Sequence, residues 1–174
     1  MTERQQFKVL RTYENFELRE YLPCVIAEVR VSGQFSTSSS SAFSTLFSYI
    51  SKGNNSSQKI AMTAPVTVTP IPSGWRLHFV MPSQEKLDTL PKPNNSQVAI
   101  RRVADHEMVS IRFSGWATAS AIKENTDRLT EWALSRQLTL VGTPQVARYN
   151  DPFTLPWRRR NEILIEIAKD AIAK

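Results

Sequence analysis

The sequence predicts an α+β fold in which two helices pack on a largely antiparallel sheet that curls towards a barrel. Three observations lead to this prediction. Apolar and polar residues alternate in several short segments, two longer segments carry apolar stripes at helical spacing, and one short motif occurs twice. Alternation at period two is typical of half-buried strands, and apolar residues three and four positions apart are typical of amphipathic helices.

The repeated motif divides the chain into two similar modules. "RVSGQFS" at 30–36 recurs as "RFSGWAT" at 112–118, with an alternating strand before each copy and a helix-like stretch after it. Two copies are too few for a solenoid of stacked repeats. We therefore expect one domain over residues 1–174, with module one at about 7–82, a polar loop at about 83–96 and module two at about 97–168.

The segment "KIAMTAPVTVTP" at 59–70 has the alternation of a strand, but Pro65 interrupts it. Proline cannot donate a ladder hydrogen bond, so we expect it at an edge, a bulge or the start of a strand, where it bends the sheet. The turn "IPSG" then leads to a second strand, "WRLHFVMP". Two further strands, "PQVARY" and "NEILIEIA", follow the second helix.

The two helices are predicted from their apolar stripes. The first lies within 37–54, where a serine provides the N-cap and Gly53 or Asn54 ends the helix. Its stripe consists of Ala42, Phe43, Leu46, Phe47 and Ile50. The second helix runs from about 119 to 137. Its stripe consists of Ile122, Leu129, Trp132 and Ala133.

Composition narrows the class of protein. With 174 residues, of which 41% are hydrophobic, the chain can bury a substantial core. The net charge of +6 is dispersed apart from the arginines at 158–160, so no nucleic-acid partner is expected. The sequence shows neither a signal peptide nor an apolar stretch of spanning length, which predicts a soluble, cytoplasmic protein without membrane insertion.

The chain also lacks the common signatures of catalysis and of tightly held metals. A single cysteine excludes an internal disulfide and a thiolate metal cage. No G-x-S-x-G, H-E-x-x-H or P-loop pattern occurs. The sequence therefore predicts a protein that is not an enzyme.

Three segments resemble the SOUL haem-binding protein family. They are "YENFELREYLPCVIAEV" at 13–29, "KIAMTAPV" at 59–66 and "ARYNDPFTLPWRRRNEI" at 147–163, in collinear order along nearly the whole chain. The resemblance implies a distorted antiparallel β-barrel with two helices, built from two pseudo-symmetric β-α-β modules. It also implies non-covalent binding of haem or another tetrapyrrole in an apolar groove beside the first helix, bordered by the C-terminal loop.

The resemblance and the residue types together suggest a set of ligand contacts. The expected cofactor-binding residues are Phe43, Leu46, Phe47, Ile50, Met62, Arg158 and Arg159. The aromatic and aliphatic side chains would form an apolar wall, and arginine can pair bidentately with a propionate. The same residues also have structural interpretations: the stripe can pack on the sheet, Met62 can fill a core gap, and Arg159 and Arg160 can form salt bridges with Glu162.

Two histidines are available to coordinate iron, and His78 is the better axial candidate. Alternation in "WRLHFVMP" places His78 on the face opposite Leu77 and Phe79, whereas His106 falls in a polar turn. The predicted function is thus reversible binding of a tetrapyrrole by a carrier or buffer. The alternative is a small-molecule effector-binding or protein-interaction module, because similar modules serve bacterial regulators and the first helix lacks the basic residue of some haem-binding relatives.

Overall fold

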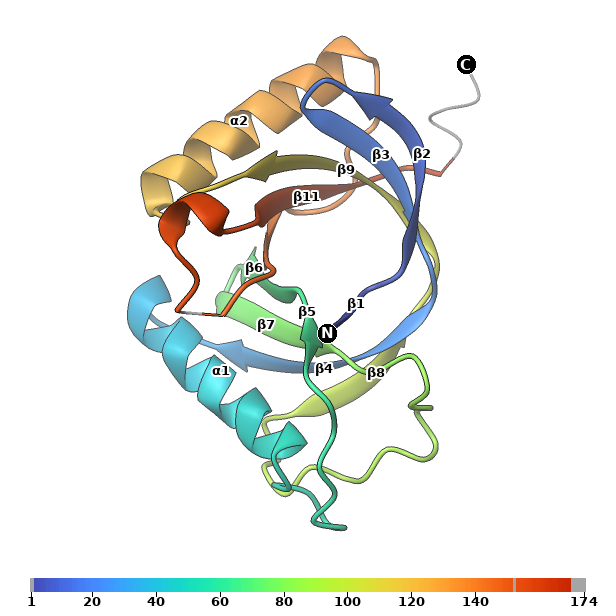
Figure 1. Cartoon of the computed structure of the whole chain (residues 1–174), viewed down its shortest axis with the longest axis vertical. Helices are drawn as coiled ribbons and strands as arrows, with labels where there is room; N and C mark the ends of the chain where they lie inside the picture. The colour runs from blue at the N-terminus through green and yellow to red at the C-terminus, as the bar shows by residue number, and fades with distance from the viewer. Residues whose placement is uncertain (1, 152, 170–174) are drawn as a thin grey trace. The chain divides into compact units, whose positions relative to one another are not determined.

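The computed structural model describes residues 2–151 and 153–169, so Pro152 of the C-terminal motif lies outside the described residues. These residues form two compact units, each with one long helix and an antiparallel sheet (Figure 1). One unit contains residues 2–5 and 23–104, and the other contains 6–22 and 105–169 apart from residue 152. The predicted α+β class, with two helices and antiparallel strands, is confirmed.

The boundaries of these units differ from the modules expected at 7–82 and 97–168. Residues 6–22 belong to the second unit, because β3 pairs with β9 along its whole length. Residues 99–103 belong to the first unit, because β8 pairs with β4. Pairing between strands that are far apart in the sequence thus determines which residues belong to each unit.

The first unit has a four-stranded antiparallel sheet in the order β6-β7-β4-β8. A separate parallel pair, β1 with β5, adds the N-terminal residues to this unit. Its elements are β1 (Glu3–Arg4), β4 (Cys24–Val31), α1 (Phe35–Ile50), β5 (Thr63–Ala64), β6 (Val66–Ile71), β7 (Gly74–Val80) and β8 (Ala99–Val103).

The second unit has a five-stranded antiparallel sheet in the order β10-β11-β9-β3-β2. Its elements are β2 (Phe7–Tyr13), β3 (Phe16–Tyr21), β9 (His106–Phe113), α2 (Ala119–Ser135), β10 (Gln145–Arg148), the 3-10 turn η1 (Pro156–Arg158) and β11 (Asn161–Ile167).

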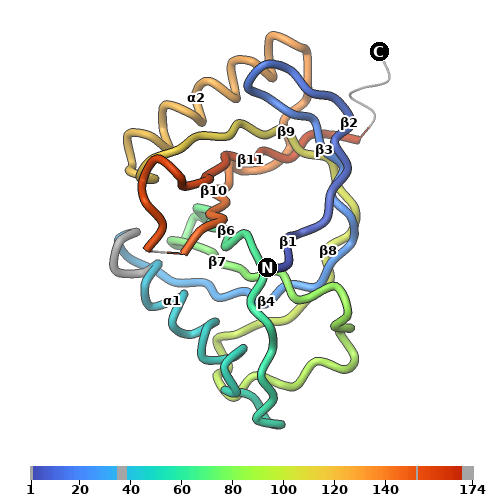
Figure 2. Tube along the Cα trace, in the orientation of Figure 1, coloured from blue at the N-terminus to red at the C-terminus, as the bar shows by residue number. Residues whose placement is uncertain are grey.

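The two units repeat one topology, as the duplicated motif predicts. In each, a strand leads through a glycine turn into the helix, and the chain returns as two antiparallel strands (Figure 2). In each sheet, the second of these strands lies between the first and the strand that precedes the helix. In the first unit β7 pairs with β6 and β4, and in the second unit β11 pairs with β10 and β9. The strands β4 and β9 also share one pattern of buried and exposed positions.

Pro65 separates two strands, as expected from its missing donor. Strand β5 ends at Ala64 and β6 begins at Val66, with a cis peptide bond between Ala64 and Pro65. The following hairpin requires a glycine at Gly74, which has φ +139°. A Cβ atom there would lie 2.2 Å from the carbonyl oxygen of Val31, so a larger residue would force the strands apart.

The ends of α1 differ from the prediction. The helix begins at Phe35, and its N-cap is Gln34 without a side-chain hydrogen bond, so no serine caps it. It ends at Ile50 with Ser51 as C-cap, and Lys52 adopts the left-handed conformation instead of Gly53. In α2, by contrast, the Thr118 hydroxyl accepts a hydrogen bond from the backbone N–H of Ala121, as an N-cap does.

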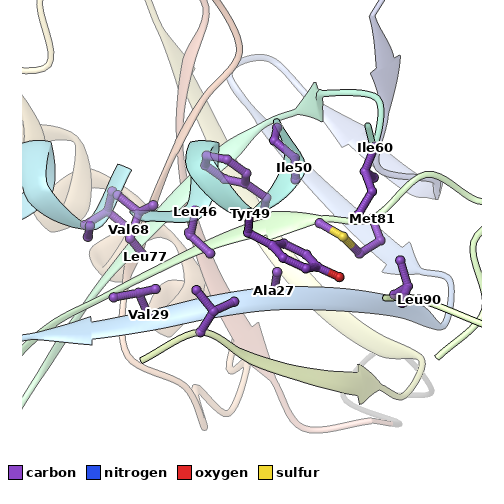
Figure 3. Close-up of a cluster of buried hydrophobic side chains, with 13 residues drawn as sticks. Ala27, Val29, Leu46, Tyr49, Ile50, Ile60, Val68, Leu77, Met81 and Leu90 are labelled. Carbon is purple, nitrogen blue, oxygen red and sulfur yellow. The ribbon is translucent and has the colours of Figure 1, made fainter. Parts of the chain in front are cut away.

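Each helix buries an apolar face against the sheet of its own unit. In the first unit, Leu46, Tyr49 and Ile50 lie over the residues of β4, β6 and β7 (Figure 3). In the second unit, Leu129 and Ala133 are completely buried, with Ile122 and Trp132 packed beside them, so the predicted stripe of this helix is confirmed.

Candidate functional site

The exposed face of α1 carries a pair of stacked phenylalanines. The rings of Phe43 and Phe47 are 5.9 Å apart at an interplanar angle of 12°. Phe43 also contacts the edge of Phe79 on β7, with ring centroids 5.5 Å apart. Phe43 is 37% exposed and Phe47 is 49% exposed. Burying such aromatic surface is favourable, so this face is suited to contact with a flat apolar ligand.

The other two predicted residues of α1 lie on the same stripe as this pair, on its side next to the sheet. Leu46 and Ile50 are buried in the core of the first unit, so they support the helix and do not present a surface. Met62, just before β5, is half-buried and packs against the same core. The predicted stripe therefore divides into a buried half that holds α1 on the sheet and an exposed half formed by Phe43 and Phe47.

The aromatic pair distinguishes α1 from α2. The buried positions of the two helices correspond in order, with Leu46 matching Leu129 and Ile50 matching Ala133. By the same correspondence, threonines occupy the positions of Phe43 and Phe47 in α2. Among the side chains that the structure describes, α1 carries a stacked aromatic pair of its own, whereas Trp132 of α2 stacks on Phe16 of β3 against the core. This asymmetry identifies the candidate ligand surface.

His78 lies on the face of the sheet opposite α1. Its neighbours Leu77 and Phe79 belong to the core beneath the helix, so alternation turns the His78 side chain to the other face. Across the strands His78 is paired with Glu28, whose buried carboxylate accepts a hydrogen bond from Arg101 at 3.1 Å. A ligand on the exposed face of α1 would be separated from His78 by the sheet, and an axial role for this histidine stays a prediction.

Arg158 and Arg159 belong to the second unit, at the end of η1. The guanidinium of Arg159 lies 3.9 Å from the centre of the Trp116 ring, and its Nε donates to the carbonyl of Thr154. Arg158 is exposed. Their predicted contact with a propionate stays a prediction. Among the described residues, no group of three or more histidine, cysteine, aspartate or glutamate side chains could hold a metal ion.

A buried ionic cluster occupies the sheet of the second unit. Both carboxylate oxygens of Glu162 accept hydrogen bonds from Arg19, at 2.7 and 3.0 Å, and Arg160 donates to Oε1 at 2.7 and 3.0 Å. The hydroxyl of Tyr149 donates to Oε2 at 2.9 Å. Glu162 is completely buried and Arg19 is 3% exposed. The alternative salt-bridge interpretation is confirmed for Arg160 with Glu162, whereas Arg159 stacks on Trp116.

Sequence reasoning did not find Arg19 as a member of this cluster. Tyr149, Arg160 and Glu162 occur together in the C-terminal motif, but Arg19 lies in the first hairpin, 143 residues before Glu162. A signal was present in the alternation of "FELREY", which places Arg19 on the same face of the strand as Glu17 and Tyr21. Its partner follows only from the pairing of β3 with β9 and of β9 with β11.

The electrostatics of Glu162 predict a loss of stability in acid. Burial alone would raise the pKa of Glu162, but hydrogen bonds and charge from Arg19, and then from Arg160, hold it below its ordinary value. A carboxyl with a lowered pKa in the folded state stabilises the protein above its unfolded pKa, and this contribution disappears as the pH falls through the folded value. We expect the free energy of unfolding to decrease between about pH 5 and pH 2 for this reason.

Urea unfolding at several acidic pH values measures this effect. The Glu162→Gln variant should show a shallower pH dependence than the wild-type protein over this range, because its side chain does not titrate. Asp127→Asn, which changes an exposed carboxylate on α2, serves as the control and should keep the wild-type slope. Identical slopes for Glu162→Gln and the wild-type protein would contradict the assignment of the acid transition to Glu162.

Together, the fold and the aromatic helix define a class: a duplicated α+β module with a candidate surface for an apolar ligand on one helix. The profile of the SOUL heme-binding protein family matches residues 2–166, and the chain belongs to this family.

The similar proteins include two with haem-binding names. Heme-binding protein 2 of Homo sapiens is 30% identical over 160 residues, which cover 86% of this chain and 76% of that protein. Heme-binding protein 1 of Xenopus laevis is 26% identical over 156 residues, which cover 85% of this chain and 81% of that protein.

Solved structures with the same fold have much lower sequence identity. The C-terminal domain of EcmrR matches with a TM-score of 0.68 at 13% identity, covering 88% of this chain and 97% of that domain. A structure described as a hydrolase from Listeria innocua matches with a TM-score of 0.63 at 10% identity, covering 91% of this chain and 94% of that chain. At these identities the similarity establishes the fold alone.

Proposed function

We propose that this protein binds haem or a related tetrapyrrole non-covalently and acts as a carrier or buffer, not as a catalyst. The observation that carries the proposal is the stacked, partly exposed pair of Phe43 and Phe47 on α1. Membership of the SOUL family supports the choice of ligand class. The bound tetrapyrrole is the cargo of the protein, and haem as cargo would pass intact to a later acceptor.

The described residues fit a ligand that is held by apolar contact. The two rings offer an aromatic surface to one face of a macrocycle, and Phe79 supports Phe43 from below. Leu46 and Ile50 fix the helix, so the rings are held in place before a ligand arrives. Preorganisation of this kind lowers the entropy cost of binding.

Apolar contact is sufficient for a reversible carrier. Burying roughly 300 Å² of macrocycle surface at about 25 cal/mol per Å² contributes about 7–8 kcal/mol before the costs of association. After these costs, a dissociation constant on the order of micromolar is expected without an axial bond from the protein. Arg158 and Arg159 are the proposed partners of the propionate carboxylates, for which the guanidinium group has the matching geometry.

A haemin titration followed in the Soret region tests this proposal. We expect saturation at one equivalent in the wild-type protein and a loss of binding of about tenfold or more in Phe47→Asp, because a charge on the contact face must be desolvated. Leu134→Asp on α2 is the matched control, since it also introduces a charge at an exposed apolar position, and it should bind as the wild-type protein does.

Two further outcomes are informative. The His78→Ala variant should keep the wild-type Soret band, because the sheet separates His78 from the face of α1 that carries the phenylalanines. A changed band in this variant would show that His78 coordinates the iron. Binding that never saturates, or that Leu134→Asp weakens as much as Phe47→Asp, would contradict a defined site on α1.

A further inference from the structure

The C-terminal loop of the second unit exposes an unusual number of large apolar side chains. Phe153 is 93% exposed, Trp157 is 70% exposed and Leu155 is 46% exposed. Trp116, from the turn before α2, is 59% exposed. Single exposed apolar residues are ordinary, but several large ones in one place mark a surface that binds something. We call these four residues, with Arg112 of β9, four positions before Trp116, and Arg158 of η1, the Trp157 surface.

Backbone contacts hold the two segments of this surface together. The N–H of Gly115 donates to the carbonyl of Pro156 at 2.9 Å, which joins the turn before α2 to η1 (Figure 1). The side-chain amide of Asn161 donates to the carbonyl of Gly115 at 3.0 Å. Arg159 then covers the ring of Trp116 at 3.9 Å. Trp116 is therefore adjacent to the loop that carries Trp157.

The loop has a defined conformation although its side chains are exposed. The carboxylate of Asp151 accepts hydrogen bonds from the backbone N–H of Phe153 at 2.9 Å and from the hydroxyl of Thr154 at 3.3 Å. The short turn η1 begins at Pro156, two residues after Thr154. The aromatic side chains are thus presented to solvent from a structured backbone, and they do not pack into the core beneath it.

The charge of the surface is positive. Arg112 and Arg158 are both exposed, and neither forms an ion pair with a carboxylate of the described residues. Arg160 is paired with Glu162, and the exposed Asp151 contributes one negative charge against the two arginines. Two guanidinium groups beside four large apolar side chains are complementary to a partner that is anionic at its surface and apolar just below it.

We propose that the Trp157 surface docks this protein onto anionic lipid headgroups. Tryptophan concentrates at the membrane–water interface, and arginine pairs with lipid phosphate groups. The attraction of a basic residue to an anionic leaflet adds to the burial of the apolar side chains. None of the helices among the described residues is long and apolar enough to cross a membrane, and the docking proposed here is peripheral.

This proposal does not require a bound haem, although it shares Arg158 with the proposed propionate contact, and vesicles test it directly. The full chain is sedimented with vesicles of phosphatidylcholine, with and without phosphatidylglycerol, at low and high salt. We expect binding to the anionic vesicles, weakened by salt, and little binding to phosphatidylcholine alone. Trp157→Ser and Phe153→Ser should each reduce the partition coefficient by about tenfold, because each removes a large apolar side chain from the interface.

Matched controls separate docking from unspecific adsorption. Leu134 on α2 has the same exposed fraction as Trp116, so Leu134→Ser should leave the partition coefficient unchanged. Arg112→Gln should weaken binding to the anionic vesicles only. Phe153→Ser should bind haemin as the wild-type protein does, which keeps this test independent of the titration described above. Circular dichroism of each variant shows whether it is folded.

Three results would overturn the proposal. The first is no sedimentation with either kind of vesicle, which would leave the surface to a protein partner. The second is equal loss of binding in Leu134→Ser and Trp157→Ser. The third is binding that depends on charge but not on Phe153 or Trp157, because a purely electrostatic attraction needs no apolar loop.

Discussion

Replacing Arg19 by alanine is expected to lower the free energy of unfolding by about 3–5 kcal/mol. The guanidinium of Arg19 donates to both oxygens of the Glu162 carboxylate and to the hydroxyl of Tyr21, with almost no exposure to water. Its removal leaves a fully buried carboxylate with Arg160 as its remaining cationic partner. Breaking a buried pair on one side costs more than the pair contributes, because the remaining charge cannot regain its hydration.

Urea unfolding at neutral pH measures this loss. The control is Lys123→Ala, which removes the exposed ion pair between Lys123 and Asp127 on α2 and should cost no more than about 0.5 kcal/mol. The comparison contrasts a buried cation, which pairs with Glu162 and with the partly exposed Glu17, with an exposed cation that pairs with Asp127 alone. A loss in Arg19→Ala as small as that in Lys123→Ala would show that water reaches Glu162 in the folded protein.

Truncating Leu46 to alanine is expected to destabilise the first unit by about 3–4 kcal/mol. Leu46 is completely buried beneath α1, where it packs with residues of β4, β6 and β7 (Figure 3). Its removal leaves a cavity that rigid strands cannot fill, and the lost transfer energy adds to the cost of that cavity. Thermal or urea unfolding provides the measurement.

The neighbouring residue gives the matched control for this variant. Phe47→Ala removes a larger side chain from the same helix, but half of that side chain is exposed, so its effect on stability should be much smaller than that of Leu46→Ala. The effect on ligand binding should be the opposite. When affinities are compared for the folded fraction of each variant, Phe47→Ala should bind haemin more weakly than Leu46→Ala. Equal destabilisation by the two variants would mean that Phe47 belongs to the core and is not available to a ligand.

Much of the fold could be predicted because it is encoded over short distances. Alternation along a strand and the stripe of a helix arise from the local geometry of the backbone, so the strand "WRLHFVMP" and the stripe of α2 were predicted in place. The repeat of Gly33 at Gly115 predicted two similar units, and three strands of each sheet follow the same order. Pro65 was expected to interrupt its strand because it has no N–H to donate.

The ends of α1 were harder to predict because several residues could perform the same role. A run of serines offered many equivalent N-caps, yet the helix begins before them at Phe35. Gly53 was a plausible stop, but Lys52 adopts the left-handed conformation. Such choices depend on small energy differences between neighbouring residues, and the packing of the whole helix decides them.

By itself, the sequence determined the α+β class, the duplication and the family, because these depend on local periodicity and on motifs that can be read in order. Only the tertiary structure decided which residues of the α1 stripe are buried, since Phe43 and Leu46 both satisfy the helical spacing but face different surroundings. It also joined Arg19 to Glu162, and Trp116 to the loop of Trp157. Such contacts arise from strand register and chain return over long distances, which no local pattern encodes.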